Sequence, residues 1–187
     1  MTPDLQREFQ LLAESARRQL KDAPKWASYR HVFSFWAFPS FAPAYRWTLY
    51  SPLRSAERQQ PFASLKIWRR DLDLEKFRSP VERLKYAKDL APTIEPDEQL
   101  WLRAAEATEI EQRIQGIPIP IFVESKIFGC DGTGFEFCCG DAFGRASIHW
   151  WESFPIEWRP FTGAVIGIVE ELERKRKTAV RAPGVNG

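Results

Sequence analysis

The sequence predicts one α+β domain in which an antiparallel or mixed sheet of about six strands carries helices on one face, with a helix at each end of the chain. Three observations lead to this class. Apolar and polar residues alternate in two groups of three short segments, and the segments around those groups repeat at helical spacing. The length of 187 residues suits one sizeable core better than two. We place the domain at 1–177 and expect 178–187 to be disordered.

The first third of the chain is predicted to form one helix and three strands. The helix covers 3–22 and begins after the capping hydroxyl of Thr2, with a proline at its first position. Its apolar residues fall on one face: Leu5, Phe9, Leu12, Ala16 and Leu20. The strands run from 29 to a proline-bounded reversal at 39–43, over 45–50 and over 62–70. The polar loop 51–61 is the segment that we expect to be mobile.

The middle of the chain is predicted to form two helices. Residues 71–75 lead to Ser79-Pro80, which opens a short helix that Pro92 closes. The second helix begins at 95–97 and ends at Gly116. Its apolar stripe is Leu100, Ala104, Ala107, Ile110 and Ile114.

The last third is predicted to form three antiparallel strands and a final helix. The strands cover 121–128, 135–139 and 145–151. Asp131-Gly132 is a strong hairpin signal, because glycine reaches a positive φ without steric cost. The segment 145–151 carries aromatic residues on both faces, which predicts a central position in the sheet.

The final helix is predicted by a change of period after Pro155. Its apolar stripe is Trp158, Phe161, Val165, Ile168 and Leu172. Gly163 and Gly167 lie four residues apart and weaken the helix, so we expect another backbone to approach closely there.

Composition limits the classes of partner. Lysine and arginine total 27 against 25 acidic residues, and this net charge of +2 gives no case for a nucleic-acid or anionic membrane partner. The aromatic fraction of 14% is high. Residues 1–22 lack the apolar run of a secretory signal, and no other stretch could span a bilayer. We therefore expect a cytoplasmic protein without a membrane partner.

Only two histidines are present, so histidine chemistry must use His31 or His149. The second lies on a predicted strand near Glu136 and Asp131, which makes His149, Asp131 and Glu136 the candidate catalytic residues. The alternative interpretation is an ordinary sheet histidine with aspartates that shape turns. The sequence contains no P-loop, dinucleotide-binding fingerprint, nucleophile elbow or zinc-helix motif. This argues against the common nucleotide-dependent enzymes and hydrolases.

A zinc site is the other chemistry that the sequence suggests. Cys130, Cys138, Cys139 and His149 lie within twenty residues of each other. Adjacent residues on a strand point to opposite faces, however, so the paired cysteines are poorly placed to bind one ion. We expect neither a metal nor a cofactor. An odd number of cysteines, two of them adjacent, also favours a reduced compartment over disulfide bonding.

Aromatic residues stand beside basic ones at several positions, most clearly at Trp68-Arg69-Arg70. Such a pattern is typical of a stacking surface for single-stranded nucleic acid or sugar. It is equally produced by aromatic residues in a core with arginines outside, which the balanced charge favours. The candidate interaction residues are Trp68, Arg69, Arg70 and Trp151.

One block of the chain resembles a known pattern. Asp131-Gly132-Thr133, Trp150-Trp151, Pro155 and Glu157-Trp158 resemble a C-terminal block of small uncharacterised bacterial proteins. The resemblance covers roughly the last seventy residues. The resemblance implies mainly a shared fold. It also implies a role in protecting cells by binding a toxin, or a role in contact-dependent systems. It supplies no functional residue.

The leading functional hypothesis is therefore a non-enzymatic protein-interaction protein of immunity or inhibitor type that binds another protein. A second hypothesis is a small hydrolase or carbohydrate-acting enzyme that uses Asp131, Glu136 and His149. A third is a nucleic-acid-binding module, in which salt should weaken binding through Arg69 and Arg70.

Overall fold

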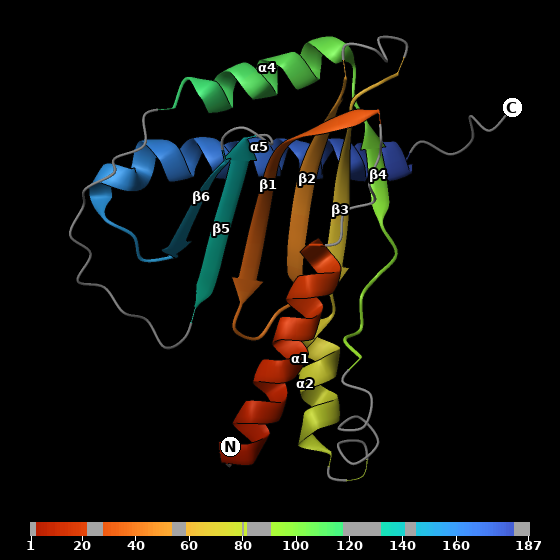
Figure 1. Cartoon of the computed structure of the whole chain (residues 1–187), viewed down its shortest axis with the longest axis vertical. Coiled ribbons are helices and arrows are strands. Elements are labelled where there is room, and N and C mark those ends of the chain that lie inside the picture. The colour runs from red at the N-terminus through yellow and green to blue at the C-terminus, as the bar shows by residue number, and fades with distance from the viewer. Residues whose placement is uncertain are drawn as a thin grey trace, which may run out of the picture.

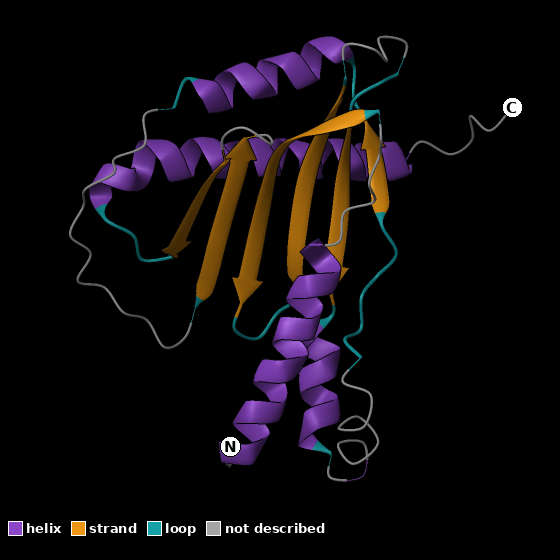
Figure 2. Ribbon diagram, in the orientation of Figure 1, coloured by secondary structure: helices purple, strands orange, loops and turns teal. Residues whose placement is uncertain are grey.

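The computed structural model describes residues 3–21, 28–53, 59–79, 81, 91–117, 132–140 and 145–181. These residues form an α+β fold in which helices flank an open six-stranded sheet (Figures 1 and 2). The helices are α1 (Pro3–Lys21), α2 (Arg70–Arg78), α4 (Ala104–Gln115) and α5 (Arg159–Arg181). The strands are β1 (Tyr29–Pro39), β2 (Ala44–Pro52), β3 (Phe62–Trp68), β4 (Glu98–Trp101), β5 (Thr133–Gly140) and β6 (Arg145–Trp151).

The strand order is β4-β3-β2-β1-β5-β6, and every neighbouring pair is antiparallel. Consecutive hairpins join β1, β2 and β3. The other side of β1 pairs with β5, which places Trp36 opposite Glu136 although 100 residues separate them. This confirms the α+β class, the antiparallel sheet and the helices near each end of the chain.

The helices cover both faces of the sheet, so the prediction that they lie on one face is wrong. One face of β1 carries Phe33 and Phe35, which pack in a cluster with α4 and α5. The opposite face carries Trp36, which packs in a second cluster with α1 and α2. Both sides of β1 are therefore apolar, and each side needs a helical layer to exclude water.

Several elements differ from the sequence prediction. A strand, β4, occupies the place where a helix was expected to start, because its residues complete the edge of the sheet beside β3. The link expected after β3 is the helix α2. The strand predicted at 121–128 lies outside the described residues, and so does much of the loop 51–61.

The C-terminal hairpin and helix bring three further corrections. β6 is an edge strand of the described sheet and is not central, and α5 shields one of its two aromatic faces. No neighbouring backbone approaches Gly163 or Gly167 on α5. The stripe with Phe161 and Leu172 is buried as predicted. α5 continues to Arg181, so the first residues of the expected disordered tail are helical.

Candidate functional site

A groove of about 650 Å³ lies on the α1 side of the sheet. α1 stands in front of the strands toward the β4 edge and leaves β5 and β6 without a described helix in front of them (Figure 1). The groove forms where this cover ends. The side chains that the argument below uses come from four elements and the β1–β2 turn: Arg17 and Lys21, Ser40, Arg70, Glu136, His149 and Trp151.

Three cations form the basic wall of the groove. Arg17 and Lys21 share a face of α1 because they are four residues apart. The Arg17 guanidinium lies 4.9 Å from the centre of the Phe38 ring. Arg70 donates from Nη1 to the carbonyl oxygen of Pro39 at 2.6 Å, and its Nε is buried without a hydrogen-bond partner among the described residues. The ion pairs of the described residues involve none of these three cations.

Two of these cations repel each other. Burial lowers the pKa of Arg70 from its usual value, and the nearby positive charge of Arg17 lowers it further. Like charges that face one groove raise the free energy of the empty site. A bound anion would relieve that repulsion, so the basic wall is suited to a carboxylate, phosphate or sulfate group.

The opposite wall belongs to the β5–β6 hairpin, where Glu136 and His149 line the groove beside aromatic residues such as Trp151. Cys138 and Ser147 neighbour these two polar side chains on the hairpin. Antiparallel pairing sets Glu136 opposite His149 and Cys138 opposite Ser147. His149 Nδ1 lies 3.8 Å from Glu136 Oε2. The Cys138 thiol donates to Glu136 Oε1 at 3.2 Å, and Ser147 Oγ lies 3.3 Å from His149 Nε2. These four side chains form a ring of contacts on one face of the hairpin.

The turn beside the groove is held by specific backbone contacts. The Ser40 hydroxyl donates to the carbonyl oxygen of Gly132 at 2.9 Å and accepts from its N–H at 3.1 Å. Gly132 has a φ of +141°, and a Cβ there would lie 2.3 Å from Glu152 Oε1. Glu152 accepts from the Thr133 N–H at 2.9 Å. Glycine is favoured at this position, because its φ is one that other residues rarely adopt and a Cβ would crowd the Glu152 side chain. The first strand of the hairpin predicted around Asp131-Gly132 lies outside the described residues.

The structure brings four of the predicted site residues into this one groove. They are Arg70, Glu136, His149 and Trp151. Asp131, the third member of the predicted catalytic group, lies outside the described residues. The sequence reasoning missed Ser147, Arg17 and Lys21. A serine two residues before a histidine on a strand, and two cations four apart on a helix, are the signals that point to them.

The other two predicted interaction residues lie elsewhere. Trp68 is 1% exposed and its indole N–H donates to Asp73 Oδ2 at 2.7 Å, so it belongs to the core and not to a binding surface. Arg69 pairs with Asp71 at 2.8 Å and with Glu95 at 3.3 Å. The hydrogen bonds that Arg69 donates to Asp71 raise the pKa of Arg69 and keep it charged, but this charge is already compensated.

The described residues hold no group of three or more histidine, cysteine, aspartate or glutamate side chains that could bind a metal ion. Cys138 and Cys139 point to opposite faces, as predicted from their adjacency, and Cys130 lies outside the described residues. None of the described helices has both the length and the apolar character needed to cross a membrane.

Comparison with known proteins finds no matching family model, curated protein or solved structure. The resemblance of the last seventy or so residues to small bacterial proteins therefore stays a prediction.

Proposed function

We propose that this protein binds a partner protein and takes an acidic segment of it into the groove between α1 and the β5–β6 hairpin. The observation that carries the proposal is the basic wall, in which the ion pairs of the described residues compensate none of Arg17, Lys21 and Arg70. Elsewhere Arg113 of α4 pairs with Glu171 at 2.9 Å, and Arg176 of α5 pairs with Glu98 at 3.0 Å. A carboxylate of the partner would supply the counter-charge that the ion pairs of the described residues do not give these three cations.

The build of the groove favours a protein segment. Its walls come from a helix and a hairpin that the sheet holds in place, so little conformational entropy is lost on binding. Trp151 is half-buried beside Gly134 and presents an aromatic surface next to the cations. Aromatic and arginine side chains dominate the binding energy of protein interfaces. An immunity or inhibitor role fits this chemistry, since complementary charge accelerates the capture of a partner.

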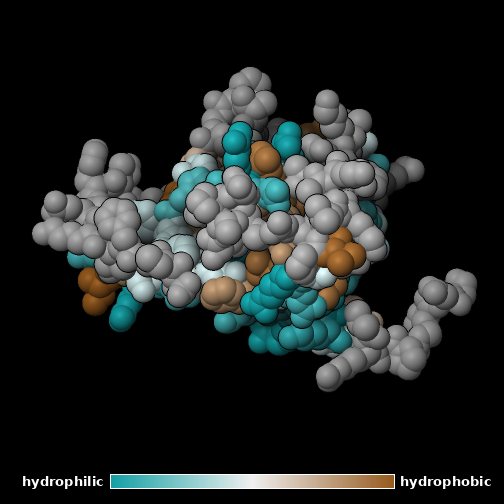
Figure 3. Space-filling model, turned by 90° about the horizontal axis from the view of Figure 1, so that it is seen from below, coloured by the Kyte–Doolittle hydropathy of each residue, from teal (hydrophilic) through white to brown (hydrophobic). Residues whose placement is uncertain are grey.

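In the view from below in Figure 3, the coloured residues are mainly hydrophilic, with small hydrophobic areas between them. Nucleic acid is a weaker candidate, because a strand needs a series of cations along its backbone and Glu136 stands on the opposite wall of the same groove.

Charge reversal in the groove tests this proposal. We expect the double variant Arg17→Glu/Lys21→Glu to lose capture of an acidic partner from lysate of the producing cells, with at least a tenfold weaker Kd for the purified pair. Reversing two cations converts attraction into repulsion, and each tenfold change corresponds to about 1.4 kcal/mol. Rising salt should weaken the wild-type complex.

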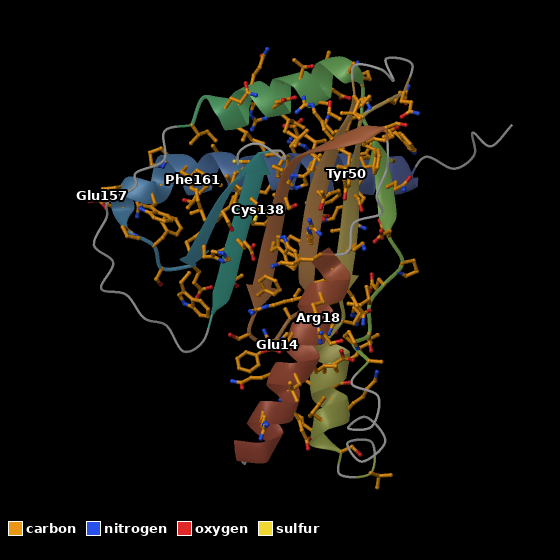
Figure 4. The ribbon with its side chains drawn as sticks, viewed as in Figure 1. Glu14, Arg18, Tyr50, Cys138, Glu157 and Phe161 are labelled. Atoms are coloured by element: carbon orange, nitrogen blue, oxygen red, sulfur yellow. The ribbon has the colours of Figure 1, made fainter. Side chains whose placement is uncertain are left out.

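The matched control is also a double charge reversal. It combines Arg18→Glu with the replacement by glutamate of one exposed lysine or arginine outside the groove. Arg18 lies on the same helix and is exposed, but it does not line the groove (Figure 4). The control carries the same kind of charge change, so it should bind as the wild type does. Equal affinity of the groove variant and the wild type would exclude the basic wall as the binding site.

A further inference from the structure

Ser147, His149 and Glu136 form an ordered chain of polar groups on the β5–β6 hairpin. Residues 147 and 149 alternate on one face of β6, and the pairing of β5 with β6 places Glu136 directly across from His149. The local sequence and the hairpin register are together sufficient to align these three side chains. No residue from a distant element is needed.

The two ring nitrogens of His149 face different groups. Nδ1 lies 3.8 Å from Glu136 Oε2, and Nε2 lies 3.3 Å from Ser147 Oγ. A carboxylate beside Nδ1 favours the tautomer that carries its proton there, which leaves the Nε2 lone pair directed at the serine hydroxyl. The arrangement is that of a hydroxyl nucleophile, an imidazole base and an orienting carboxylate. Such contacts are commonly longer before substrate binds than during reaction.

The three side chains differ in solvent exposure: the proposed nucleophile and base are exposed, and the carboxylate is mostly buried. Ser147 is exposed and the His149 side chain is 67% exposed, whereas the Glu136 side chain is 14% exposed. The reacting groups are therefore accessible and the orienting carboxylate is sheltered. Cys138 lies on β5 (Figure 4) and is buried. Its thiol donates to Glu136 Oε1 at 3.2 Å and also lies 3.2 Å from Ser147 Oγ, so it contacts both the carboxylate and the hydroxyl.

We propose that this hairpin hydrolyses carboxylic esters that carry a second, anionic group. Ser147 and His149 are the catalytic residues and Glu136 is the positioning residue. The anionic group of the ester binds at the basic wall, where Arg17 and Lys21 line the same groove as His149. The reacting carbonyl then lies over the hairpin. This inference goes beyond partner binding and does not depend on it.

The reaction proceeds in two balanced steps. In the first, Ser147 Oγ forms a bond to the ester carbonyl carbon while His149 Nε2 takes the hydroxyl proton. That proton passes to the departing alkoxide, which leaves as the alcohol when the ester C–O bond breaks. In the second, water attacks the acyl-serine, His149 takes the proton of the water, and the acid leaves as Ser147 regains its proton.

The first test measures ester hydrolysis by the full chain. The probes are 4-nitrophenyl benzoate and the anionic mono-4-nitrophenyl terephthalate, whose carboxylate cannot reach its own ester, and hydrolysis is followed by release of nitrophenolate. After subtraction of the rate without protein, we expect at least a tenfold preference for the terephthalate ester, and Ser147→Ala or His149→Ala should lower kcat on the order of 100-fold. Ser153→Ala is the matched control, because Ser153 is also an exposed serine. Equal rates for the two esters, or for Ser147→Ala and wild type, would overturn the proposal.

A labelling experiment on the wild type does not rely on any variant folding. A fluorophosphonate probe should add to Ser147 with loss of fluoride, and peptide mass spectrometry locates it. Modification of other residues only would contradict the assignment. For Glu136→Gln we expect a lower kcat with an unchanged KM, because this residue orients the base and does not hold substrate. Parallel loss of kcat, KM and melting temperature would mean a structural role only.

The two proposals fail independently. Ser147→Ala should leave the affinity for an acidic partner unchanged, since it removes no charge from the groove. Absence of a partner together with a Ser147-dependent hydrolysis would discard the binding proposal alone. A charge-dependent partner with no labelling at Ser147 would discard the hydrolysis alone.

Discussion

The two faces of the sheet differ in what they bury. The face under α4 and α5 holds a cluster of aliphatic and aromatic side chains. On the face toward α1 the sheet also buries polar side chains: Ser34, Arg46, Thr48 and Ser64. Arg46 is 6% exposed, lies 4.8 Å from the Trp36 ring centre, and donates from Nη2 to Ser34 Oγ at 2.8 Å.

The two faces therefore have different roles: the apolar face mainly stabilises the fold, and the polar face carries the candidate site. Apolar packing is non-directional and tolerates shifts, so it suits the layer that stabilises the fold. Buried polar groups need fixed partners, so they hold the strands of the other face in one register. The row of Thr48, Ser34, Cys138 and Ser147 runs across neighbouring strands on that face, from the covered part to the open groove.

The largest expected effect lies on the apolar face. Phe161 on α5 is 2% exposed and meets Phe137, Trp150 and Trp158 edge-on. Phe161→Ala should lower the free energy of unfolding by about 3–5 kcal/mol, because it removes buried aromatic contacts and leaves a cavity in the core. Urea titration followed by circular dichroism measures it. Phe41→Ala, at a residue that is 69% exposed, is the control and should change little.

The next effect concerns Asp73, a buried carboxylate on the α1 side of the sheet. Asp73 is fully buried and accepts from Trp68 Nε1 at 2.7 Å, from the Thr93 N–H at 3.0 Å and from Thr93 Oγ1 at 2.6 Å. Asp73→Ala removes the acceptor of these three hydrogen bonds and should cost about 2–3 kcal/mol. Asp73→Asn keeps one acceptor and should cost less. A loss as small as that of the exposed Phe41→Ala control would contradict the role of this network.

A smaller effect is expected from the polar row. Ser34 is 1% exposed, accepts from Arg46, and lies 2.7 Å from His31 Nε2. Ser34→Ala should cost about 1–2 kcal/mol, because it removes the buried hydroxyl that accepts a hydrogen bond from Arg46. The comparison is with Ser153→Ala at an exposed position, measured by the same titration. Indistinguishable midpoints for the two variants would show that the row stabilises nothing.

The smallest effect belongs to ion pairs on the solvent side of the apolar layer. Arg103 and then Lys175 hold the pKa of the Glu106 carboxyl at about 2, below its usual 4.5. A lowered pKa means that this carboxylate stabilises the fold above pH 4.5 and loses that contribution as pH falls toward 2. Glu106→Gln should therefore cost less than about 1 kcal/mol at pH 7, because such pairs are screened by solvent. The difference from wild type should shrink between pH 4.5 and 2, and a pH-independent difference would contradict this origin.

Much of the local structure was predictable from the sequence. The stripe that contains Phe161 and Leu172 predicted α5, and alternation predicted β1, β2, β3, β5 and β6. β4 and α2 were missed because four residues of strand and nine of helix carry too little periodic signal. His149 and Glu136 were selected by residue type and hairpin register alone, whereas Arg17 and Lys21 looked like an ordinary solvated helix face.

The sequence by itself determined the α+β class and the hairpin that aligns Ser147, His149 and Glu136, because both follow from contacts between residues close in the chain. Only the tertiary structure decided that helices cover both faces, that β5 pairs with β1, and that α1 carries its cations to a groove beside β6. Those features depend on which apolar faces meet across long separations. Local periodicity shows which face of a helix or strand is apolar, but it does not show which other face packs against it.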